Sequence, residues 1–442
     1  MGRKYESWGR CPKAVHLRTR AFWRSGASFP DCPSSVLPFG LGRSYGDSCL
    51  NNGGTLIDMS GLDRFISLDT STGLLRCEAG ITLGQILERL VPQGWFLPVV
   101  PGTKYVTVGG AIANDIHGKN HHAAGTFGCH VTKFELLRSD QSRLLCSPTE
   151  NEDLYRATIG GLGLTGLIIW AEIQLKKIDS PWIEAEFIRF ESLDDFFPLA
   201  EESAADFEYT VSWIDCTAQG NSLGRGIFIR GNHSTKDLPG RKAPSLGTMF
   251  SVPADMPNFL LNRFSIKTFN FLYFYKQGPK PIRRLLHYNP FFFPLDAIDS
   301  WNRMYGSRGF FQYQPVIPQP SPLRVKGTCE PIRELFEKIA KSGGGSFLTV
   351  LKDFGSVKSP GLMSFPRPGV TLALDFPNRG TETLQLFKQL DAIVHEHGGR
   401  LYPAKDARMS PQSFREFFPE SETFTEYIDP KISSSFWRRV MS

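Results

Sequence analysis

Residues 102–128 read GTKYVTVGGAIANDIHGKNHHAAGTFG, and residues 40–47 read GLGRSYGD. Glycine lets the backbone approach a ligand closely, and backbone N–H groups left unpaired in such turns bind phosphate oxygens. The longer stretch adds imidazole, lysine and amide side chains to this backbone freedom. Together the two segments predict a site for a cofactor that carries a pyrophosphate.

The composition is that of a folded globular chain. Its 442 residues are 41% hydrophobic and 21% charged, which predicts two or three domains with sizeable cores. The 35 phenylalanines, beside 12 tyrosines and 8 tryptophans, also favour an apolar ligand or a lipid surface. The net charge of +6 is not gathered into one basic run. It therefore favours an anionic substrate or membrane face and argues against nucleic-acid binding.

Cysteine spacing and hydropathy limit the cellular compartment and the relation to membranes that the sequence allows. No C-x-x-C pair occurs, so the sequence predicts neither a zinc site nor a dense disulfide framework, and it favours reduced, cytoplasmic thiols. No stretch approaches the roughly 18 apolar residues of a spanning helix, and no apolar signal region follows the N-terminus. We therefore expect a soluble or peripheral protein. The cysteines are Cys11, Cys32, Cys49, Cys77, Cys129, Cys146, Cys216 and Cys329.

Residues 257–311 combine aromatic and basic side chains. Such a mixture suits the interface of an anionic lipid membrane. A core helix with its loops explains the pattern equally well, so both alternatives stay open. The aromatic members are Phe259, Phe264, Phe269, Phe271, Phe274 and Phe291 to Phe293, and the basic members are Arg263, Lys267, Lys276, Lys280, Arg283 and Arg284.

Short strands and helices alternate along the chain. Alternating patterns and turn residues predict strands over 56–59, 74–79, 134–138, 167–175, 207–215 and 309–317, with a proline-rich break over 315–322. Helical spacing predicts helices over 82–90, 153–158, 331–341, 381–397 and 413–418. After Pro181-Trp182 the predicted strands become rich in aromatic residues, and we expect a domain boundary there. In the helix over 381–397, the residues expected to face inward are Leu384, Phe387, Leu390, Ile393 and Val394.

Residues 161–166, GLGLTG, match the G-x-G-x-x-G pattern of a Rossmann dinucleotide site. That site needs a strand before the glycines and a helix after them, so that the pyrophosphate meets the helix N-terminus. Here a predicted helix precedes the glycines and a β-rich run follows them. We therefore reject a Rossmann site and expect a turn that packs near the same cofactor.

Three closely spaced histidines are candidate metal ligands, but the pattern argues against a metal. Adjacent His121 and His122 would point to opposite faces of a strand, and no set of carboxylates and cysteines completes a site. His117 lies between glycine-rich turns, beside Asp115 and Lys119. This setting favours a catalytic or cofactor-contacting role for His117 over a purely structural one.

Lys405 is a second candidate for the active site. It follows a predicted strand that starts after Gly398-Gly399, and strand ends that border loops commonly carry functional side chains. A solvated surface lysine is the alternative. The chain has no G-x-S-x-G elbow and no cysteine in a catalytic setting, so a hydrolase is not indicated.

These segments give the chain a family resemblance over nearly its whole length. It resembles the flavin oxidoreductases of the vanillyl-alcohol oxidase and p-cresol methylhydroxylase superfamily, and within it the oxidases of polyprenylphosphoryl-ribose. Residues 115–122 are specific to that subgroup, whereas the glycine-rich turns alone indicate only the superfamily. The matching stretches are residues 40–47, 108–128, 160–166, 312–314, 372–377 and 398–408, with Asp429-Pro430 and Phe436 near the C-terminus.

The resemblance implies an α+β fold with FAD as cofactor. It implies a two-part FAD-binding domain of the p-cresol methylhydroxylase type, residues 1–180 completed by 400–442, and an inserted substrate domain of antiparallel sheet and helices over 181–399. Arg43 stands where many members tether flavin through a histidine, so non-covalent FAD is expected. The residues implied to approach FAD are Pro38, Phe39, Gly40, Leu41, Gly42, Arg43, Ser44, Tyr45, Gly46, Asp47, Gly102, Thr107, Val108, Gly109, Gly110, Asn114, Asp115, Ile116, His117, Ile168 and Tyr402.

The resemblance also implies a reaction. It is the oxidation of the 2-hydroxyl of polyprenylphosphoryl-ribose to the 2-keto sugar, the first half of an epimerisation to arabinose. The flavin takes the hydride, so the protein supplies orientation and a proton acceptor. His117 and Lys405 are the catalytic candidates, and Lys405 would need a lowered pKa to accept the proton. The candidate substrate residues are Tyr45, Lys119, Trp213, Gln312, Gln314, Lys352 and Lys405.

The same resemblance implies a partner enzyme, an electron acceptor and a place for the lipid tail. A separate NADH-dependent reductase is expected to reduce the keto sugar, because no second nucleotide site is recognised, and quinone or dioxygen is expected to reoxidise the flavin. Residues 257–311 are expected to receive the polyprenyl tail, with the protein at the inner face of the membrane.

Two departures from the family pattern and two alternatives remain. Ala373 replaces a cysteine, which should remove sensitivity to inhibitors that trap a thiol, and Phe292 stands where the family carries tyrosine, which leaves substrate contacts there open.

One alternative is a flavin oxidase of a soluble alditol or aldonolactone, against which residues 115–122 argue. The other is a non-enzymatic lipid-binding protein that has lost flavin, against which the intact glycine-rich turns argue.

Overall fold

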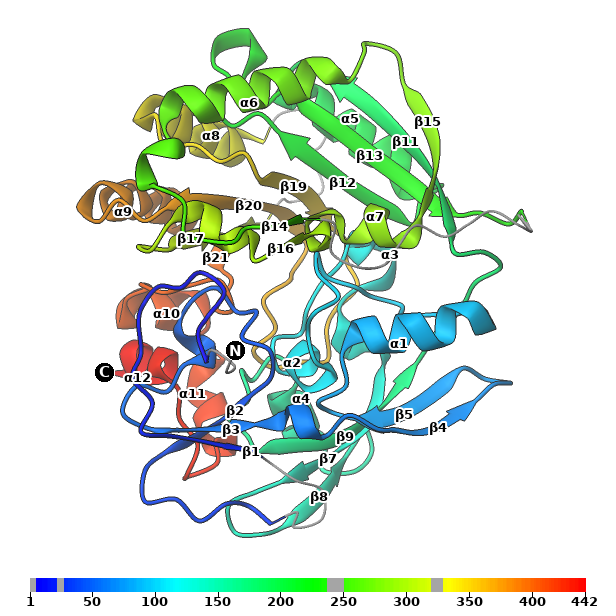
Figure 1. The fold of residues 1–442 in the computed structure, drawn as a ribbon, viewed down its shortest axis with the longest axis vertical. Coiled ribbons are helices and arrows are strands. Elements are labelled where there is room, and N and C mark those ends of the chain that lie inside the picture. Colours follow the sequence, from blue (N-terminus) through cyan, green and yellow to red (C-terminus); the bar gives the residue numbers. More distant parts are fainter. Residues whose placement is uncertain (1–4, 22–27, 237–249, 319–328) are drawn as a thin grey trace.

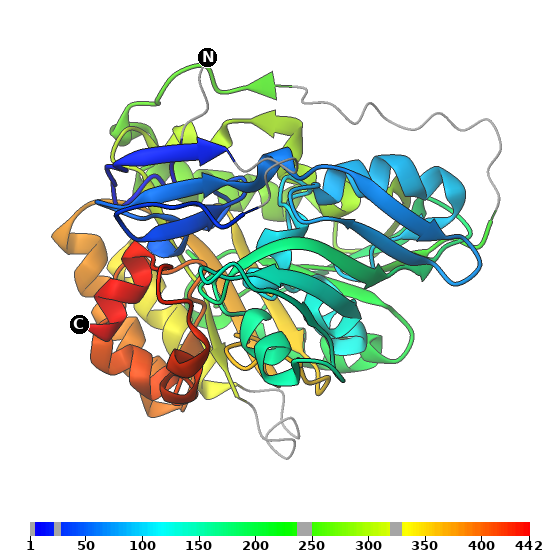
Figure 2. The ribbon, with the colours of Figure 1, turned by 90° about the horizontal axis from the view of Figure 1, so that it is seen from below.

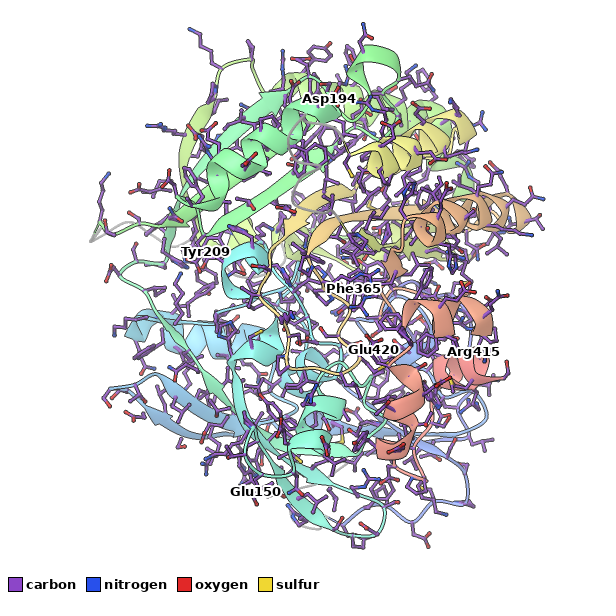
Figure 3. The ribbon with its side chains drawn as sticks, turned by 180° about the vertical axis from the view of Figure 1, so that it is seen from behind. Glu150, Asp194, Tyr209, Phe365, Arg415 and Glu420 are labelled. Atoms are coloured by element: carbon purple, nitrogen blue, oxygen red, sulfur yellow. The ribbon has the colours of Figure 1, made fainter. Side chains whose placement is uncertain are left out.

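The computed structural model describes residues 5–21, 28–236, 250–318 and 329–442. Two smaller sheets with their helices form one half of the molecule, and a large antiparallel sheet with its helices forms the other half (Figure 1). Figure 3 shows Asp194 and Glu150 at opposite ends, with Phe365 and Tyr209 between them, near the level where the halves meet. Among the described residues, no helix combines the length and apolar character needed to cross a membrane.

The first 180 residues build two sheets of different type. The sheet β1-β3-β2 is parallel, and the sheet β4-β5-β9-β7-β8 is antiparallel. A short pair, β6 (Trp95–Phe96) with β10 (Lys176–Lys177), forms a separate two-stranded sheet. The strands are β1 (Arg18–Ala21), β2 (Val36–Phe39), β3 (Thr55–Asp58), β4 (Phe65–Asp69), β5 (Leu74–Glu78), β7 (Val131–Leu137), β8 (Arg143–Cys146) and β9 (Leu167–Gln174), and the helices are α1 (Leu83–Leu90), α2 (Val108–Ala113), α3 (His121–Ala124) and α4 (Glu152–Thr158).

The large sheet has nine strands in the order β15-β11-β13-β12-β19-β20-β18-β21, with β17 also paired to β20. All its pairs are antiparallel. Its strands are β11 (Trp182–Phe190), β12 (Tyr209–Ile214), β13 (Gly226–His233), β15 (Ile282–His287), β17 (Phe310–Tyr313), β18 (Pro315–Ile317), β19 (Thr349–Phe354), β20 (Gly369–Pro377) and β21 (Arg400–Leu401). Its helices are α5 (Leu193–Ala204), α6 (Arg263–Lys276), α7 (Tyr288–Phe292), α8 (Glu330–Ser342) and α9 (Thr381–Glu396), and β14 (Phe250–Ser251) pairs with β16 (Ile298–Asp299).

Local sequence signals explain many of these elements. Thr82 caps α1 through a reciprocal capping box with Gln85, and α1 ends at Leu90 as predicted, followed by the 3-10 helix Val91–Gln93. The predicted strand over 309–317 is divided at Gln314 into β17 and β18. The part of the predicted proline-rich break over residues 319–322 lies outside the described residues. The prediction that Leu384 faces inward is wrong, because this side chain is 42% exposed, whereas Phe387, Leu390, Ile393 and Val394 are buried.

The C-terminal segment returns to the N-terminal half. Helices α10 (Pro411–Phe417), α11 (Ser421–Phe424) and α12 (Ser435–Met441) lie beside the sheet β1-β3-β2 (Figure 2). Ile432 bridges Val36 at the edge of that sheet. The guanidinium of Arg439 on α12 donates hydrogen bonds to Asp47 at 2.7 and 2.9 Å and to Asp406 at 2.9 Å. These contacts fix the segment that carries Lys405.

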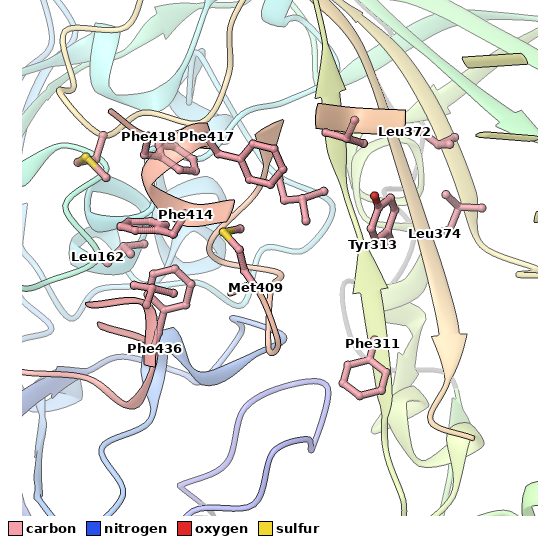
Figure 4. Close-up of a cluster of buried hydrophobic side chains, with 14 of the residues drawn as sticks. Leu162, Phe311, Tyr313, Leu372, Leu374, Met409, Phe414, Phe417, Phe418 and Phe436 are labelled. Atoms are coloured by element: carbon pink, nitrogen blue, oxygen red, sulfur yellow. The ribbon is translucent and has the colours of Figure 1, made fainter. Parts of the chain in front are cut away.

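One hydrophobic core extends from the C-terminal helices into the large sheet. Phe414, Phe417 and Phe436 lie on the helices, and Tyr313 and Leu372 lie on the facing strands (Figure 4). Burial of this apolar surface is the main source of stability, at about 25 cal/mol per Å². It also fixes the strands of the large sheet relative to the N-terminal half.

Helix α6 carries apolar residues on two sides. Ile266 and Phe274 are buried against the sheet, whereas Phe264 is 79% exposed. Phe271 and Tyr275 share the outer side, with ring centroids 4.6 Å apart. The aromatic residues of the segment 257–311 therefore divide: Phe259, Phe264, Phe269 and Phe271 are exposed, and Phe274, Phe291, Phe292 and Phe293 belong to cores.

Candidate active site

A cavity of about 620 Å³ lies between the two halves. On one side its wall is formed by the loop after β2, by residues 100–119 and by the turn before β9. On the other side it is formed by β12, β17, β19 and β20 and by the loop after β21. The cavity therefore joins glycine-rich backbone to side chains of the large sheet.

Glycine is required in the loop after β2. Gly42 has a φ of 62°, and a Cβ at this position would lie 2.4 Å from the carbonyl oxygen of Glu6. Next to it, Arg43 donates from Nε to the carbonyl oxygen of Tyr105 at 3.1 Å, and its guanidinium lies 4.1 Å from the ring centre of Trp8. A partly buried cation is thus held in a wall of closely packed backbone, which suits an anionic ligand.

His117 is the centre of a polar chain across the cavity. Its Nε2 lies 3.0 Å from Nε2 of Gln314, and its Nδ1 lies 3.1 Å from Nζ of Lys352. Its ring also packs against Phe354 and Tyr402. Burial, and then the charge of Lys352, hold the pKa of His117 well below its usual value, so the imidazole is neutral.

Three lysines, Lys119, Lys352 and Lys405, line the same cavity as His117. Burial lowers the pKa of Lys352 to about 7, with the charges of Lys119 and Lys405 as further causes. Burial also lowers the pKa of Lys119 to about 8 and that of Lys405 to about 8, with Asp375 opposing the shift at Lys405. Nζ of Lys405 lies 3.8 Å from the ring centre of Tyr45.

Comparison with known proteins identifies the family. The model of the FAD binding domain family matches residues 32–147. The chain is 39% identical to the decaprenylphosphoryl-β-D-ribose oxidase of Mycolicibacterium smegmatis, over 92% of this chain and 89% of that enzyme. The chain belongs to this family of FAD-dependent oxidases. It is also 31% identical to an uncharacterized protein of Streptomyces coelicolor over 81% of this chain, and 35% identical to human Δ24-sterol reductase over 26% of it.

As a member of this family the protein is an FAD-dependent oxidoreductase with an α+β FAD-binding fold. The cavity fits the cofactor: Gly40, Gly109 and Gly163 keep its first wall free of side chains, and Arg43 supplies a positive charge beside them. Bound FAD supplies the hydride acceptor for the oxidation. The turn over residues 160–166 contributes Leu162, Gly163 and Gly166 to the cavity wall.

Most residues expected to approach FAD line the cavity, and four lie behind its wall. A Cβ at Gly46 would lie 1.6 Å from the carbonyl oxygen of Asp406, so glycine lets the C-terminal loop close in. Asp47 pairs with Arg439, Val108 is fully buried, and Asp115 accepts hydrogen bonds from N–H of Gly128 at 2.8 Å and from Oγ of Ser359 at 2.5 Å. The lining members are Pro38, Phe39, Gly40, Leu41, Gly42, Arg43, Ser44, Tyr45, Gly102, Thr107, Gly109, Gly110, Asn114, Ile116, His117, Ile168 and Tyr402.

The candidate substrate residues divide in the same way. Tyr45, Lys119, Gln312, Gln314, Lys352 and Lys405 line the cavity, whereas Trp213 lies beyond it. Nε1 of Trp213 donates to the carbonyl oxygen of Phe347 at 3.0 Å, and its ring packs against Tyr273 of α6.

The two departures from the family pattern occupy different places. Ala373 lines the cavity, where a larger side chain would face the ligand. Phe292 is buried in an aromatic cluster with Phe96 and Tyr209, at 5.4 and 4.8 Å between ring centroids. Phe292 is not among the residues that line the described cavity.

The expectation that His121 and His122 lie on a strand is wrong, because both belong to the short helix α3. His122 donates from Nε2 to the carbonyl oxygen of Phe207 at 2.9 Å, which ties α3 to the loop before β12. The buried ring of His121 packs on Phe354, with 4.3 Å between ring centroids. In the described parts of the chain, no group of His, Cys, Asp and Glu side chains is placed to hold a metal ion.

Sequence reasoning missed the carboxyl groups that line the cavity, those of Asp375, Asp296 and Asp299. Asp375 on β20 accepts a hydrogen bond from Gln312, and Asp296 accepts one from the N–H of Lys104 at 2.8 Å. The sequence carries one weak signal for the first of them. Asp375 lies in the stretch 372–377 that supports the family resemblance, although no function attached to it there.

Proposed function

We propose that this protein oxidises the 2-hydroxyl of polyprenylphosphoryl-ribose to the 2-keto sugar. The observation that carries the proposal is the cluster of Lys119, Lys352 and Lys405 around His117, opposite the glycine-rich wall of an FAD site. Lysine is a point charge suited to phosphate. The identity to decaprenylphosphoryl-β-D-ribose oxidase over nearly the whole chain supports the same substrate class.

Roles for the side chains follow from their contacts. Lys119 and Lys352 are proposed to hold the sugar phosphate, and Gln312 and Gln314 the ring hydroxyls. Lys405 is proposed to donate a hydrogen bond to the reacting hydroxyl, since its pKa of about 8 keeps it mostly charged at neutral pH. Both ring nitrogens of His117 already have partners, so His117 fixes the positions of Gln314 and Lys352 at the reacting sugar.

The polyprenyl tail is proposed to leave the cavity beneath α6. Val211 and Val350 line the cavity on β12 and β19, and Trp213 follows Val211 on the same face of β12. From Trp213 the aromatic contacts continue to Tyr273 at 4.6 Å and to Phe269 at 5.8 Å from Tyr273. This sequence of apolar side chains connects the cavity to the exposed side of α6.

The exposed side of α6 is proposed to face an anionic lipid bilayer. Phe259, Phe264 and Phe271 are 72%, 79% and 51% exposed there. No acidic residue occurs between Asp255 and Asp296, although the same segment contains six lysine and arginine residues. Aromatic rings beside basic side chains match the interface of an anionic membrane.

Vesicle flotation tests the membrane face. The protein is expected to bind vesicles containing phosphatidylglycerol, to lose binding as salt rises, and to bind phosphatidylcholine vesicles weakly. The double change Phe264→Ser and Phe271→Ser should reduce binding. The matched control, Ile66→Ser with Leu384→Ser, removes exposed apolar side chains elsewhere. Equal binding by both variants would contradict the assignment to α6.

Several further features belong to the same proposal. Residues 1–180 with 400–442 are proposed to form the FAD-binding unit, and 181–399 the substrate domain, because the C-terminal helices pack on the first sheet.

FAD is proposed to be non-covalent, since Arg43 is held by Tyr105 and Trp8. Cys11, Cys32, Cys49, Cys77, Cys129, Cys146 and Cys216 form no disulfide among the described residues, which supports a cytoplasmic site of action at the inner membrane face. A separate NADH-dependent reductase would complete the epimerisation, with quinone or dioxygen as electron acceptor.

Anaerobic reduction of the bound flavin tests the substrate. The FAD-loaded protein is mixed with polyprenylphosphoryl-ribose, other polyprenyl-phosphate sugars, free alditols and aldonolactones, and its yellow absorbance is followed. Bleaching by the lipid-linked ribose is expected. Bleaching by a free alditol or lactone alone would establish an oxidase of soluble sugars, and failure to take up FAD would establish a non-enzymatic lipid-binding protein.

A further inference from the structure

Asp375 is a buried side chain with one unpartnered oxygen at the cavity wall. Its residue is 1% exposed, and Oδ1 accepts a hydrogen bond from Nε2 of Gln312 at 2.6 Å. Oδ2 is also buried and has no hydrogen-bond partner among the described residues. An unpaired oxygen of a buried carboxyl group costs free energy. Its place at a ligand cavity indicates that a ligand group completes it.

Strand alternation places Asp375 on the cavity side of the large sheet. Ala373, two residues earlier on β20, lines the same cavity, whereas Leu372 and Leu374 point to the other face and belong to the core (Figure 4). Gln312 lies directly opposite Asp375 in the pairing of β17 with β20. The carboxyl group is therefore held by regular sheet and not by a loop.

The groups that face Asp375 come from different elements of the fold. Lys405 follows β21, Gln312 lies on β17, Tyr45 follows β2, and Tyr305 ends the 3-10 helix Trp301–Tyr305. Burial raises the pKa of both tyrosines, so their phenol groups stay neutral. Lys405 is close enough to lower the pKa of Asp375, yet no ion pair within 4.0 Å joins these two described side chains. The space between them suits a ligand hydroxyl that contacts both.

The protonation of Asp375 suits a base near neutral pH. Burial raises its pKa to about 7, and Gln312 and Lys405 oppose the shift. A general base works best when its pKa lies near the working pH. The two other candidates fit this task less well. His117 has partners at both ring nitrogens, and Lys405 is mostly protonated at neutral pH.

We propose that Oδ2 of Asp375 accepts the proton of the hydroxyl group that is oxidised, while Lys405 donates a hydrogen bond to the same oxygen. This role rests on the proposed function. The O–H bond breaks and its proton passes to Asp375. The C–H bond breaks and its electron pair leaves with the hydride to FAD, the oxidant, so that a C=O bond forms. Asp375 afterwards releases the proton to solvent.

The variant Asp375→Asn tests the step in the FAD-loaded protein. The amide keeps the shape of the side chain but accepts no proton. Flavin binding is expected to persist, and anaerobic bleaching by polyprenylphosphoryl-ribose is expected to slow by at least about 100-fold. The rise of the wild-type rate with pH through about 7 should disappear, because the carboxylate is the active form. Asp375→Glu should recover part of the rate and the pH dependence. Equal bleaching by wild type and Asp375→Asn would overturn the proposal.

A measurement without substrate keeps the test independent of turnover. Infrared spectra of the wild-type holoenzyme should show a carboxylic acid C=O band that disappears as the pH rises through about 7. The band should be absent from Asp375→Asn and present in the control Asp391→Asn, which alters a carboxyl group paired with Arg408. A wild-type protein without such a band overturns the proposal, even if Asp375→Asn fails to fold. Failure of the lipid-linked ribose to bleach the wild type would instead count against the substrate.

Discussion

Nδ1 of His117 lies 3.1 Å from Nζ of Lys352, and Nε2 of the same ring lies 3.0 Å from the amide nitrogen of Gln314. A neutral imidazole has one N–H group, so its two nitrogens take opposite roles. When the Gln314 amide donates to Nε2, the ring proton is on Nδ1 and is donated to an uncharged Lys352 amine. The pKa of Lys352, lowered to about 7, means that the uncharged amine and the ammonium group are both populated near neutral pH, and that the ammonium group prevails at the acid pH where His117 titrates.

Replacing Lys352 by methionine is expected to raise the pKa of His117. Burial is the larger cause of the depressed pKa and remains, but the repulsion from the Lys352 charge is removed. Nitrogen-15 NMR of the labelled imidazole, titrated toward acid pH, measures the change. In the control Lys133→Met, a lysine paired with Glu172 is removed and the titration of His117 should not move. An unchanged titration in Lys352→Met would show that Lys352 carries no charge beside His117.

Lys405→Ala is expected to keep bound FAD while slowing anaerobic bleaching by substrate at least about 100-fold. In the proposed mechanism, the ammonium group near Tyr45 stabilises the negative charge that develops on the reacting oxygen. Stopped-flow absorbance of the flavin measures the rate. The control Lys388→Ala removes an exposed lysine on α9. Bleaching at the wild-type rate would remove Lys405 from the mechanism.

Local elements of this fold are predictable because their signals lie within a few residues. The capping box of Thr82 with Gln85 starts α1, and Ser410 caps α10 by accepting from the N–H of Ser413. The glycine-rich loop is predictable for the same reason, since Gly42 adopts a φ that favours glycine. The sequence settings of His117 and Lys405 marked both residues as candidates, and the family resemblance then supplied the cofactor.

Contacts between residues far apart in the sequence explain the parts of the site that the sequence did not predict. The contact of Gln312 with Asp375 depends on the register of β17 with β20, which no local pattern specifies. Trp213 lies on the same face of β12 as Val211. However, α6 covers Trp213, and of these two residues only Val211 lines the cavity. His121 and His122 are helical because α3 is anchored by His122 to the backbone of residue 207, and two residues are too few for a periodic signal.

Removing Arg439 is expected to destabilise the protein by about 3 kcal/mol. Arg439→Met leaves the buried carboxylates of Asp47 and Asp406 without their shared guanidinium partner. Urea unfolding followed by circular dichroism measures the free energy of unfolding. Arg415→Met, which removes an exposed arginine on α10, serves as the control. Equal stability of the two variants would mean that solvent satisfies these carboxylates.

Ala373→Cys is expected to create a reactive thiol in the cavity. The wild type already has Cys49 in the wall, but burial raises its pKa to about 12, so that thiol stays protonated and unreactive. A cysteine at position 373, on a wall that also carries Lys352 and Lys405, would ionise more readily.

An electrophile that traps cysteine should therefore modify Ala373→Cys and spare the wild type, as intact-protein mass spectrometry would show. Flavin bleaching by substrate should survive the substitution itself, because hydride transfer needs no thiol. Ala373→Ser, which adds a group of similar shape without sulfur, should resist the reagent. Modification of the wild type at the same rate would place the reactive thiol elsewhere, with Cys49 as the first residue to replace.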